Sequence, residues 1–122
     1  MSDLELEQDI EQVESDIENV KKAIRRYDDL QTLMNTPEWK KLIEEGYLRD
    51  EAARVVSLKG DLQMRMAGEV QREWLEDMIT GIGAFKQYLN FIRQAGASAK
   101  QQLAQHQETH ATLLKEQMGG SQ

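Results

Sequence analysis

The amino-acid sequence predicts an all-α fold, with two long heptad-bearing helices and a short helix-turn-helix pair between them. Three observations lead to this prediction. Apolar residues repeat in steps of three and four at both ends of the chain, the period of a helix face that packs along another helix. The 122 residues include one proline, so long helices are permitted. The hydrophobic fraction of 39% is low for a compact globule and favours elongated helices that each bury one stripe.

The first helix is expected over residues 1–35 and is strongly acidic in its first half. Its apolar stripe, the N-terminal seam, consists of Leu6, Ile10, Val13, Ile17, Val20, Ile24, Tyr27, Gln31 and Met34. Acids dominate from Asp3 to Glu18, and the first base is Lys21. Acidic residues near the start of a helix and basic residues towards its end interact favourably with the helix macrodipole. A second interpretation stays open, in which these acids mimic nucleic acid for a basic partner.

A short helical pair is expected over residues 36–60. Thr36 can cap its first helix, with Pro37 in the first helical position. Gly46 then ends that helix, Asp50 caps the next, and Gly60 stops it. The expected core of this head consists of Trp39, Leu42, Ile43, Leu48, Val55, Val56 and Leu58. Residues 61–68 lose the helical period and are predicted to form a loop.

Two short helices around a glycine have the scale of a DNA-binding helix-turn-helix. The fit is partial, since the would-be recognition helix opens with Asp50 and Glu51. In this interpretation, phosphate contacts would come from Arg49, Arg54 and Lys59. A plain packed helical hairpin is the other interpretation of the same residues.

The second long helix is expected over residues 69–118, with a flexible tail at 119–122. Its stripe, the C-terminal seam, consists of Leu75, Met78, Ile82, Phe85, Leu89, Ile92, Gly96, Ala99, Leu103, His106, His110 and Leu113. Gly81 and Gly83 each cost about 1 kcal/mol relative to alanine inside a helix. One continuous helix, or a bend at 81–83, fits the same pattern.

The two seams predict that the long helices pair, either within the chain as an antiparallel hairpin or between chains as a coiled coil. In the preferred antiparallel hairpin, Met34 lies beside Met78. This register places acids between Glu7 and Glu18 opposite the moderately basic stretch that begins at Arg93. Small residues around Gly96 let two backbones approach closely. Residual seam surface is expected to drive homo-oligomerisation. The predicted oligomer and partner seam consists of Ile10, Val13, Ile17, Val20, Ile24, Met78, Ile82, Phe85, Leu89, Ile92, Leu103, His106 and His110.

Nothing in the sequence resembles an active site, so we expect no enzyme, no catalytic residue and no cofactor. His106 and His110 have the spacing at which two imidazoles share a metal ion, but a third ligand is missing and no metal site is expected. Because histidine titrates near neutral pH, the pair is instead expected to make this end of the chain sensitive to pH.

Charge and composition limit the possible partners. The net charge of −7 argues against broad, non-specific nucleic-acid binding, which depends on neutralising phosphates. The chain has no cysteine, and it shows neither a signal peptide nor an apolar run long enough to span a membrane. We expect a soluble protein without membrane contact.

Two stretches, Glu38–Asp61 and Ile82–Leu89, resemble a group of small all-helical proteins of tailed bacteriophages. The resemblance covers Trp39 to Ile92, about half of the chain. Those proteins tend to have Asp-Pro after the third helix, where this chain has Asp61-Leu62. The resemblance implies a virion, assembly or packaging component, located in the host cytoplasm during assembly or in the virion, and it carries no catalytic motif.

Three functions are compatible with these features. The first is a structural or assembly protein that forms homo-oligomers and contacts other phage or virion proteins through its helices. The second is a small DNA-packaging protein, similar to a terminase small subunit, that reads DNA with the short pair. The third is an acidic inhibitor that mimics nucleic acid.

Overall fold

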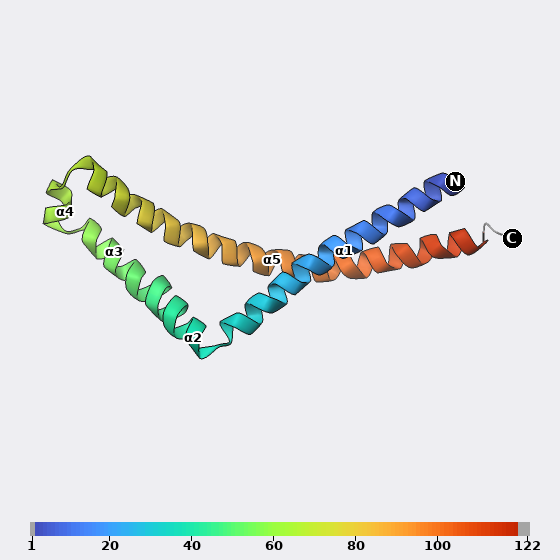
Figure 1. Cartoon of the computed structure of the whole chain (residues 1–122), viewed down its shortest axis with the longest axis horizontal. Coiled ribbons are helices and arrows are strands. Elements are labelled where there is room, and N and C mark those ends of the chain that lie inside the picture. The colour runs from blue at the N-terminus through green and yellow to red at the C-terminus, as the bar shows by residue number, and fades with distance from the viewer. Residues whose placement is uncertain (1, 120–122) are drawn as a thin grey trace. The chain divides into compact units, whose positions relative to one another are not determined.

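The computed structural model describes residues 2–119, and every secondary-structure element in this range is helical, which confirms the all-α class (Figure 1). The elements in chain order are α1 (Asp3–Met34), α2 (Pro37–Trp39), the π-helix η1 (Lys40–Glu51), α3 (Ala52–Lys59), α4 (Leu62–Met66) and α5 (Glu69–Gly119). The chain forms two compact units. Unit 1 combines Met1–Asp29 with Ile92–Gln122, and unit 2 is Leu30–Phe91, so α5 contributes to both.

Helix starts follow the capping residues of the sequence. The Ser2 hydroxyl accepts a hydrogen bond from the Glu5 N–H at 3.2 Å and caps α1. The Thr36 hydroxyl accepts from the Trp39 N–H at 3.2 Å, with Pro37 in the first turn, which confirms the helix start predicted there. The same hydroxyl donates to the Leu33 carbonyl at 2.7 Å, so Thr36 serves the end of α1 as well.

The predicted turn at Gly46 is wrong. Helical backbone continues without a break from Pro37 to Lys59, and its middle, η1, is a π-helix with i→i+5 hydrogen bonds. A π-helix takes more residues per turn than an α-helix. The spacing of its inward residues, which are four, five and four positions apart, matches this wider period: Trp39, Ile43, Leu48 and Ala52.

Gly46 has a role inside this wide helix. A Cβ atom added at residue 46 would lie 3.1 Å from the Lys41 carbonyl oxygen, five residues back, which is closer than ordinary van der Waals contact. Glycine therefore relieves a crowded turn. Asp50, predicted to cap a second helix, lies inside η1 and accepts a hydrogen bond from Arg49. The helix-turn-helix part of the predicted architecture is thus replaced by one helical rod.

Two side chains expected in the core are outside it. Leu42 and Val56 are exposed by 64% and 60%, and the neighbouring residue in each case, Ile43 or Val55, takes the inward position. The predicted end of α3 at Gly60 is confirmed. Residues 61–68 are not wholly irregular, because the Asp61 carboxylate accepts from the Gln63 N–H at 2.8 Å and starts α4.

Unit 2 is an antiparallel packing of η1 and α3 on the first part of α5. At one end, Lys59 Nζ lies 2.8 Å from Glu76 Oε1, and at the other, the rings of Tyr47 and Phe85 meet edge to face at 5.8 Å between centroids. The core between them is formed by buried Val55, Leu75 and Ile82, with Tyr47, Leu48, Ala52, Leu58, Met64, Met78 and Ile79 packed around it.

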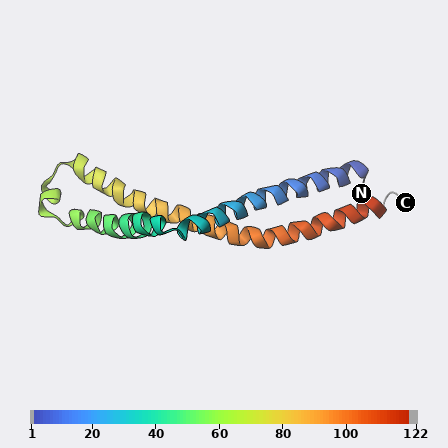
Figure 2. The same cartoon turned by 60° about the horizontal axis from the view of Figure 1, so that its bottom comes forward.

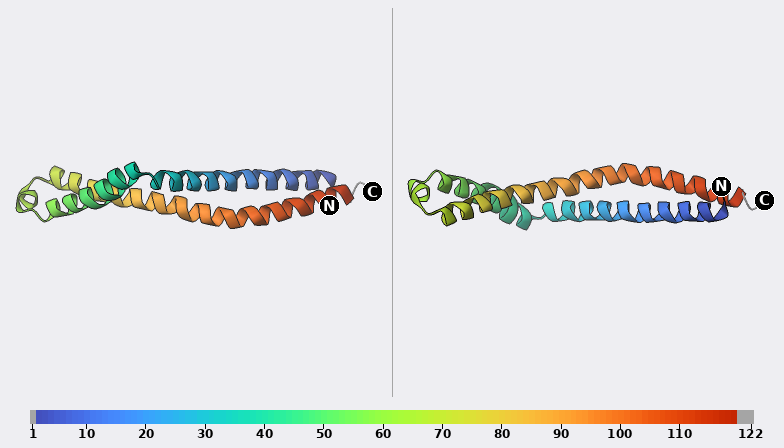
Figure 3. Two further views of the ribbon diagram at one scale, coloured as in Figure 1. Left: turned by 90° about the horizontal axis from the view of Figure 1, so that it is seen from below. Right: turned by 90° about the horizontal axis from the view of Figure 1, so that it is seen from above.

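Unit 1 is an antiparallel pair of α1 and the second part of α5, which lie side by side in Figure 2 and in both views of Figure 3. Glu14 contacts His110, and Tyr27 contacts the backbone at Gly96, so the numbers of facing residues sum to about 124. In the predicted pairing, Met34 faces Met78, and these residue numbers sum to 112. The predicted register is therefore wrong, because α1 lies about twelve residues further along α5 than expected. The part of α5 that was predicted to contact the end of α1 packs on α3 and η1.

α5 is one continuous helix that includes Gly81 and Gly83. Its bounds, Glu69–Gly119, leave Gly119 as its last residue. The rest of the predicted flexible tail, residues 120–122, lies outside the described residues.

Truncating Leu75 to alanine should lower the free energy of unfolding by about 2–5 kcal/mol, because this side chain is 2% exposed and its loss leaves a cavity. Leu62→Ala is the matched control, and its 68% exposure predicts a change within about 0.5 kcal/mol. Urea unfolding followed by circular dichroism measures both. Equal effects of the two variants would contradict the core described here.

Candidate functional site

The seam residues of unit 1 pack within the chain. On α1, Ile10, Val13 and Val20 are buried, and Ile17 and Ile24 are half-buried. On α5, Ile92 and Ala99 are buried, whereas Leu103, His106 and His110 are half-buried. The side chains predicted to meet a partner here are therefore used between α1 and α5.

The remaining seam residues lie in unit 2. Ile82 belongs to the buried core and Met78 packs against it. Phe85 contacts two rings, those of Tyr47 and Trp39, and Leu89 is 9% exposed. With both halves of α5 covered in this way, the predicted seam offers no open face to a further helix.

The tightest contact in unit 1 is made by Gly96 and Tyr27. A Cβ atom at residue 96 would lie 2.6 Å from the Tyr27 Cγ and closer still to its Cβ, so a side chain cannot be accommodated without movement. One turn further along α5, Lys100 Nζ lies 4.9 Å from the centroid of the Tyr27 ring, a cation–π contact. Close approach at this small residue was expected from the sequence, and the structure places it against α1.

His110 meets a carboxylate from α1. Its Nε2 lies 3.1 Å from Glu14 Oε1, and the imidazole is 27% exposed. In its neutral form the ring donates Nε2–H to this oxygen, and in its charged form it makes an ion pair. His106 is half-buried one turn earlier on the same face. Within residues 2–119, no group of three or more histidine, cysteine, aspartate or glutamate side chains has the geometry to hold a metal ion.

The cations proposed to contact DNA are each paired with an acid. The Arg54 guanidinium donates to Glu51 from both Nε and Nη2, and this bonding lowers the pKa of Glu51 and raises that of Arg54. The hydrogen bond with Asp50 likewise raises the pKa of Arg49. Lys59 pairs with Glu76. The structure therefore has no turn between two helices here, and each of the three cations lies beside an acid at an exposed site.

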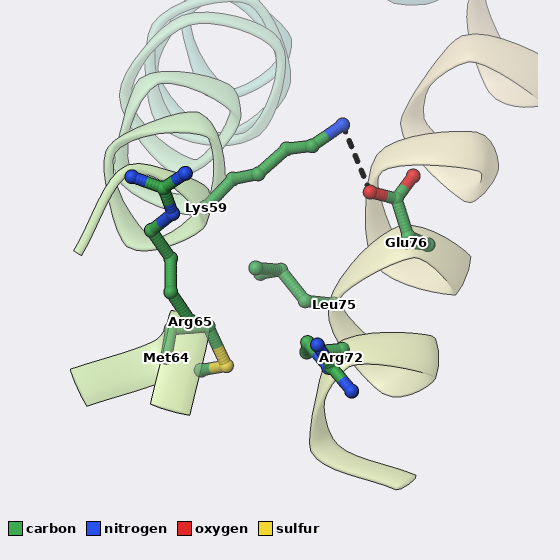
Figure 4. A pocket seen from close by; sticks show the side chains of 6 residues that line it. All are labelled: Lys59, Met64, Arg65, Arg72, Leu75 and Glu76. Carbon is green, nitrogen blue, oxygen red and sulfur yellow. Dashed lines mark ion pairs between the residues drawn. The ribbon is translucent and has the colours of Figure 1, made fainter. Parts of the chain in front are cut away.

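One open pocket of unit 2 has three basic residues among the six that line it. It lies where α3, α4 and the start of α5 meet, and its volume is about 380 Å³. Figure 4 shows Lys59 reaching from α3 to Glu76 on α5, with Leu75 below it, Arg65 on the left and Arg72 below Leu75. The lining residues are Lys59, Met64, Arg65, Arg72, Leu75 and Glu76. Lys59 and Glu76 are both more than half exposed, and water and salt weaken charge attraction at such a site. The pocket can attract an anion but offers little to hold one.

A second heptad stripe on α5 is exposed along its whole length. We call it the outer stripe, and its members step alternately by four and three: Val70, Trp74, Asp77, Gly81, Ala84, Tyr88 and Phe91. Trp74 and Tyr88 are each 53% exposed, and Phe91 is 60% exposed. These three large aromatic side chains on one face of one helix all face solvent, and they form one of the apolar surfaces that the chain leaves exposed.

The outer stripe was missed in the sequence although its period is visible there. It runs parallel to the C-terminal seam in the same helix, and the seam is richer in aliphatic residues. Small Gly81 and Ala84 in its centre also interrupt the apolar pattern. The signal that identifies it is the pair of aromatic positions, Trp74 and Tyr88, fourteen residues apart and therefore on the same face.

No protein-family model, curated protein or solved structure matches this chain.

Across the part of the chain that the structure describes, no helix combines the length and the apolar character required to cross a membrane.

Two glycine-to-alanine variants on α5 should change stability in opposite directions. Gly96→Ala forces the Tyr27 side chain away and should destabilise the chain by about 1–3 kcal/mol, as overpacked sites do. Gly81→Ala meets no atom within 4 Å and should stabilise it by up to about 1 kcal/mol through helix propensity. Urea unfolding at low protein concentration measures both. Stabilisation by Gly96→Ala would contradict the contact with Tyr27.

Proposed function

We propose that the protein is a non-enzymatic structural or assembly protein of a tailed phage, acting through helix-mediated self-association and contacts with other virion proteins. The observation that carries this proposal is the outer stripe, where Trp74, Tyr88 and Phe91 are exposed on a single helix face. Exposed aromatic side chains are enriched at protein interfaces, and Tyr88 and Phe91 lie one turn apart on α5. The phage context follows from the resemblance of residues 39–92.

The surface that supports this function differs from the one expected from the sequence. Ile17 and Leu89 lie in the packing of the chain itself, so a charged residue at either position would disturb folding and would not report on assembly. Tyr88 is the informative position, because a substitution there alters an exposed face.

The test is the solution mass over a range of protein concentrations, by light scattering and sedimentation. The proposal predicts species heavier than the 14.1 kDa chain, in an equilibrium that shifts with concentration. Tyr88→Asp should shift it towards the monomer without loss of helical content. Asn90→Asp is the matched control, since residue 90 is exposed on another side of α5. A wild-type chain that stays monomeric at all concentrations would contradict self-association.

A further inference from the structure

We propose that the contact between His110 and Glu14 is a pH-dependent clamp, which tightens the packing of α1 on the end of α5 when the imidazole gains a proton. The clamp lies in unit 1, whereas the outer stripe lies in unit 2, so it does not depend on the proposed self-association. Sensitivity to pH at this end was expected from the sequence. The contact with α1 gives the histidine a partner and the response a direction.

The geometry of the contact suits both protonation states of His110. Its Nε2 lies 3.1 Å from Glu14 Oε1, and the neutral ring donates Nε2–H to this oxygen. A further proton binds at Nδ1, the other ring nitrogen, and leaves this hydrogen bond in place. The bond then joins an imidazolium to a carboxylate, and such charge-assisted bonds are stronger than those of a neutral donor. Protonation therefore strengthens a contact that already exists.

The charges of the two facing segments favour the same direction. From Asp3 to Glu18, α1 has eight acids and no base. In the observed register this segment faces residues 106–119 of α5, which contain two acids and one lysine, a net charge of −1 with both histidines neutral. Protonation of both histidines changes this charge to +1. Two negative segments then become a negative and a positive one, which attract each other.

The charged groups nearest the imidazole are acidic on α1, and a second histidine lies on α5. Glu11 and Glu18 lie within about one helical turn of Glu14, whereas Lys21, the first base, is two turns away. On α5, His106 is half-buried one turn before the clamp, and within the described residues it makes no hydrogen bond or ion pair. The direct contact with an acid therefore assigns the response to the later histidine.

Partial burial works against a charged imidazole, because it removes water from the ring. The ring of His110 keeps 27% of its surface exposed and meets the carboxylate directly, so the ion pair outweighs this loss of water. Glu14 is itself 56% exposed, and ion pairs at such sites are weak. The expected gain is about two- to fivefold in the equilibrium between the packed and the locally open state.

The test is amide hydrogen exchange of the full chain, followed by mass spectrometry between about pH 5.5 and pH 8, the range in which histidine changes its charge. Protection factors, corrected for the intrinsic effect of pH on exchange, should be about two- to fivefold higher at the lower pH in residues 3–18 and 106–118. Residues 52–59 of α3 are the internal reference, because both histidines of the chain lie in unit 1. Equal or lower protection of the two unit 1 segments at the lower pH would overturn the clamp.

Three glutamine variants separate the clamp from other effects of pH. His110→Gln keeps a polar side chain that cannot become charged, and Glu14→Gln removes the negative partner, so each should abolish the rise in protection. His106→Gln is the matched control and should keep the rise, because the contact with Glu14 remains. A full response in His110→Gln or Glu14→Gln, or its loss in His106→Gln alone, would overturn the assignment to this contact.

Discussion

The contact between Gly96 and Tyr27 is the constraint on which unit 1 depends. The Tyr27 side chain lies directly on the backbone of α5, at a distance that only glycine permits. This contact selects one register of α1 from the many that a heptad stripe allows, because sliding such a stripe still places apolar residues against apolar residues. The contacts further along follow from it: Lys100 lies over the Tyr27 ring, and Glu14 meets His110.

A second constraint is that α5 has two different partners along its length. Its first part packs on η1 and α3 around Val55 and Leu75, and its second part packs on α1. Every residue of the C-terminal seam is buried or half-buried as a result. The outer stripe is an apolar face of α5 that this packing leaves exposed, which is why the proposed function depends on it.

The sequence predicted the helical fold and the main element boundaries well, because these depend on local chemistry. Thr36 and Pro37 start a helix, Gly60 ends one, and the 3–4 apolar period identifies the buried face of each long helix. The register of α1 was not predictable from a repeating stripe. The π-helix was missed because Gly46 was interpreted as a stop signal, whereas it relieves a contact with the Lys41 carbonyl that exists only in the wider helix.

For the candidate site, the sequence indicated helix-mediated contacts but identified the wrong face. The seam residues form the more strongly apolar pattern, and the chain buries them in its own helix packing. Trp74, Tyr88 and Phe91 stand out only when the exposure of each side chain is known. The acids Asp50 and Glu51 already weakened the DNA-binding interpretation in the sequence, and the structure adds that they form ion pairs with Arg49 and Arg54 within a continuous helix.

The most direct test of this structure is the register of α1 on α5, measured as the distance between pairs of spin labels attached to introduced cysteines. Ser15, Ala97 and Thr109 are exposed positions of unit 1. The structure predicts a short distance for labels at 15 and 109 and a distance longer by roughly 10 Å for labels at 15 and 97. The two sites on α5 are twelve residues apart, about 18 Å along the helix axis, and this offset is perpendicular to the separation of about 10 Å between the two helices. A shorter distance between 15 and 97 would contradict the contact between Gly96 and Tyr27 and the two-partner arrangement of α5.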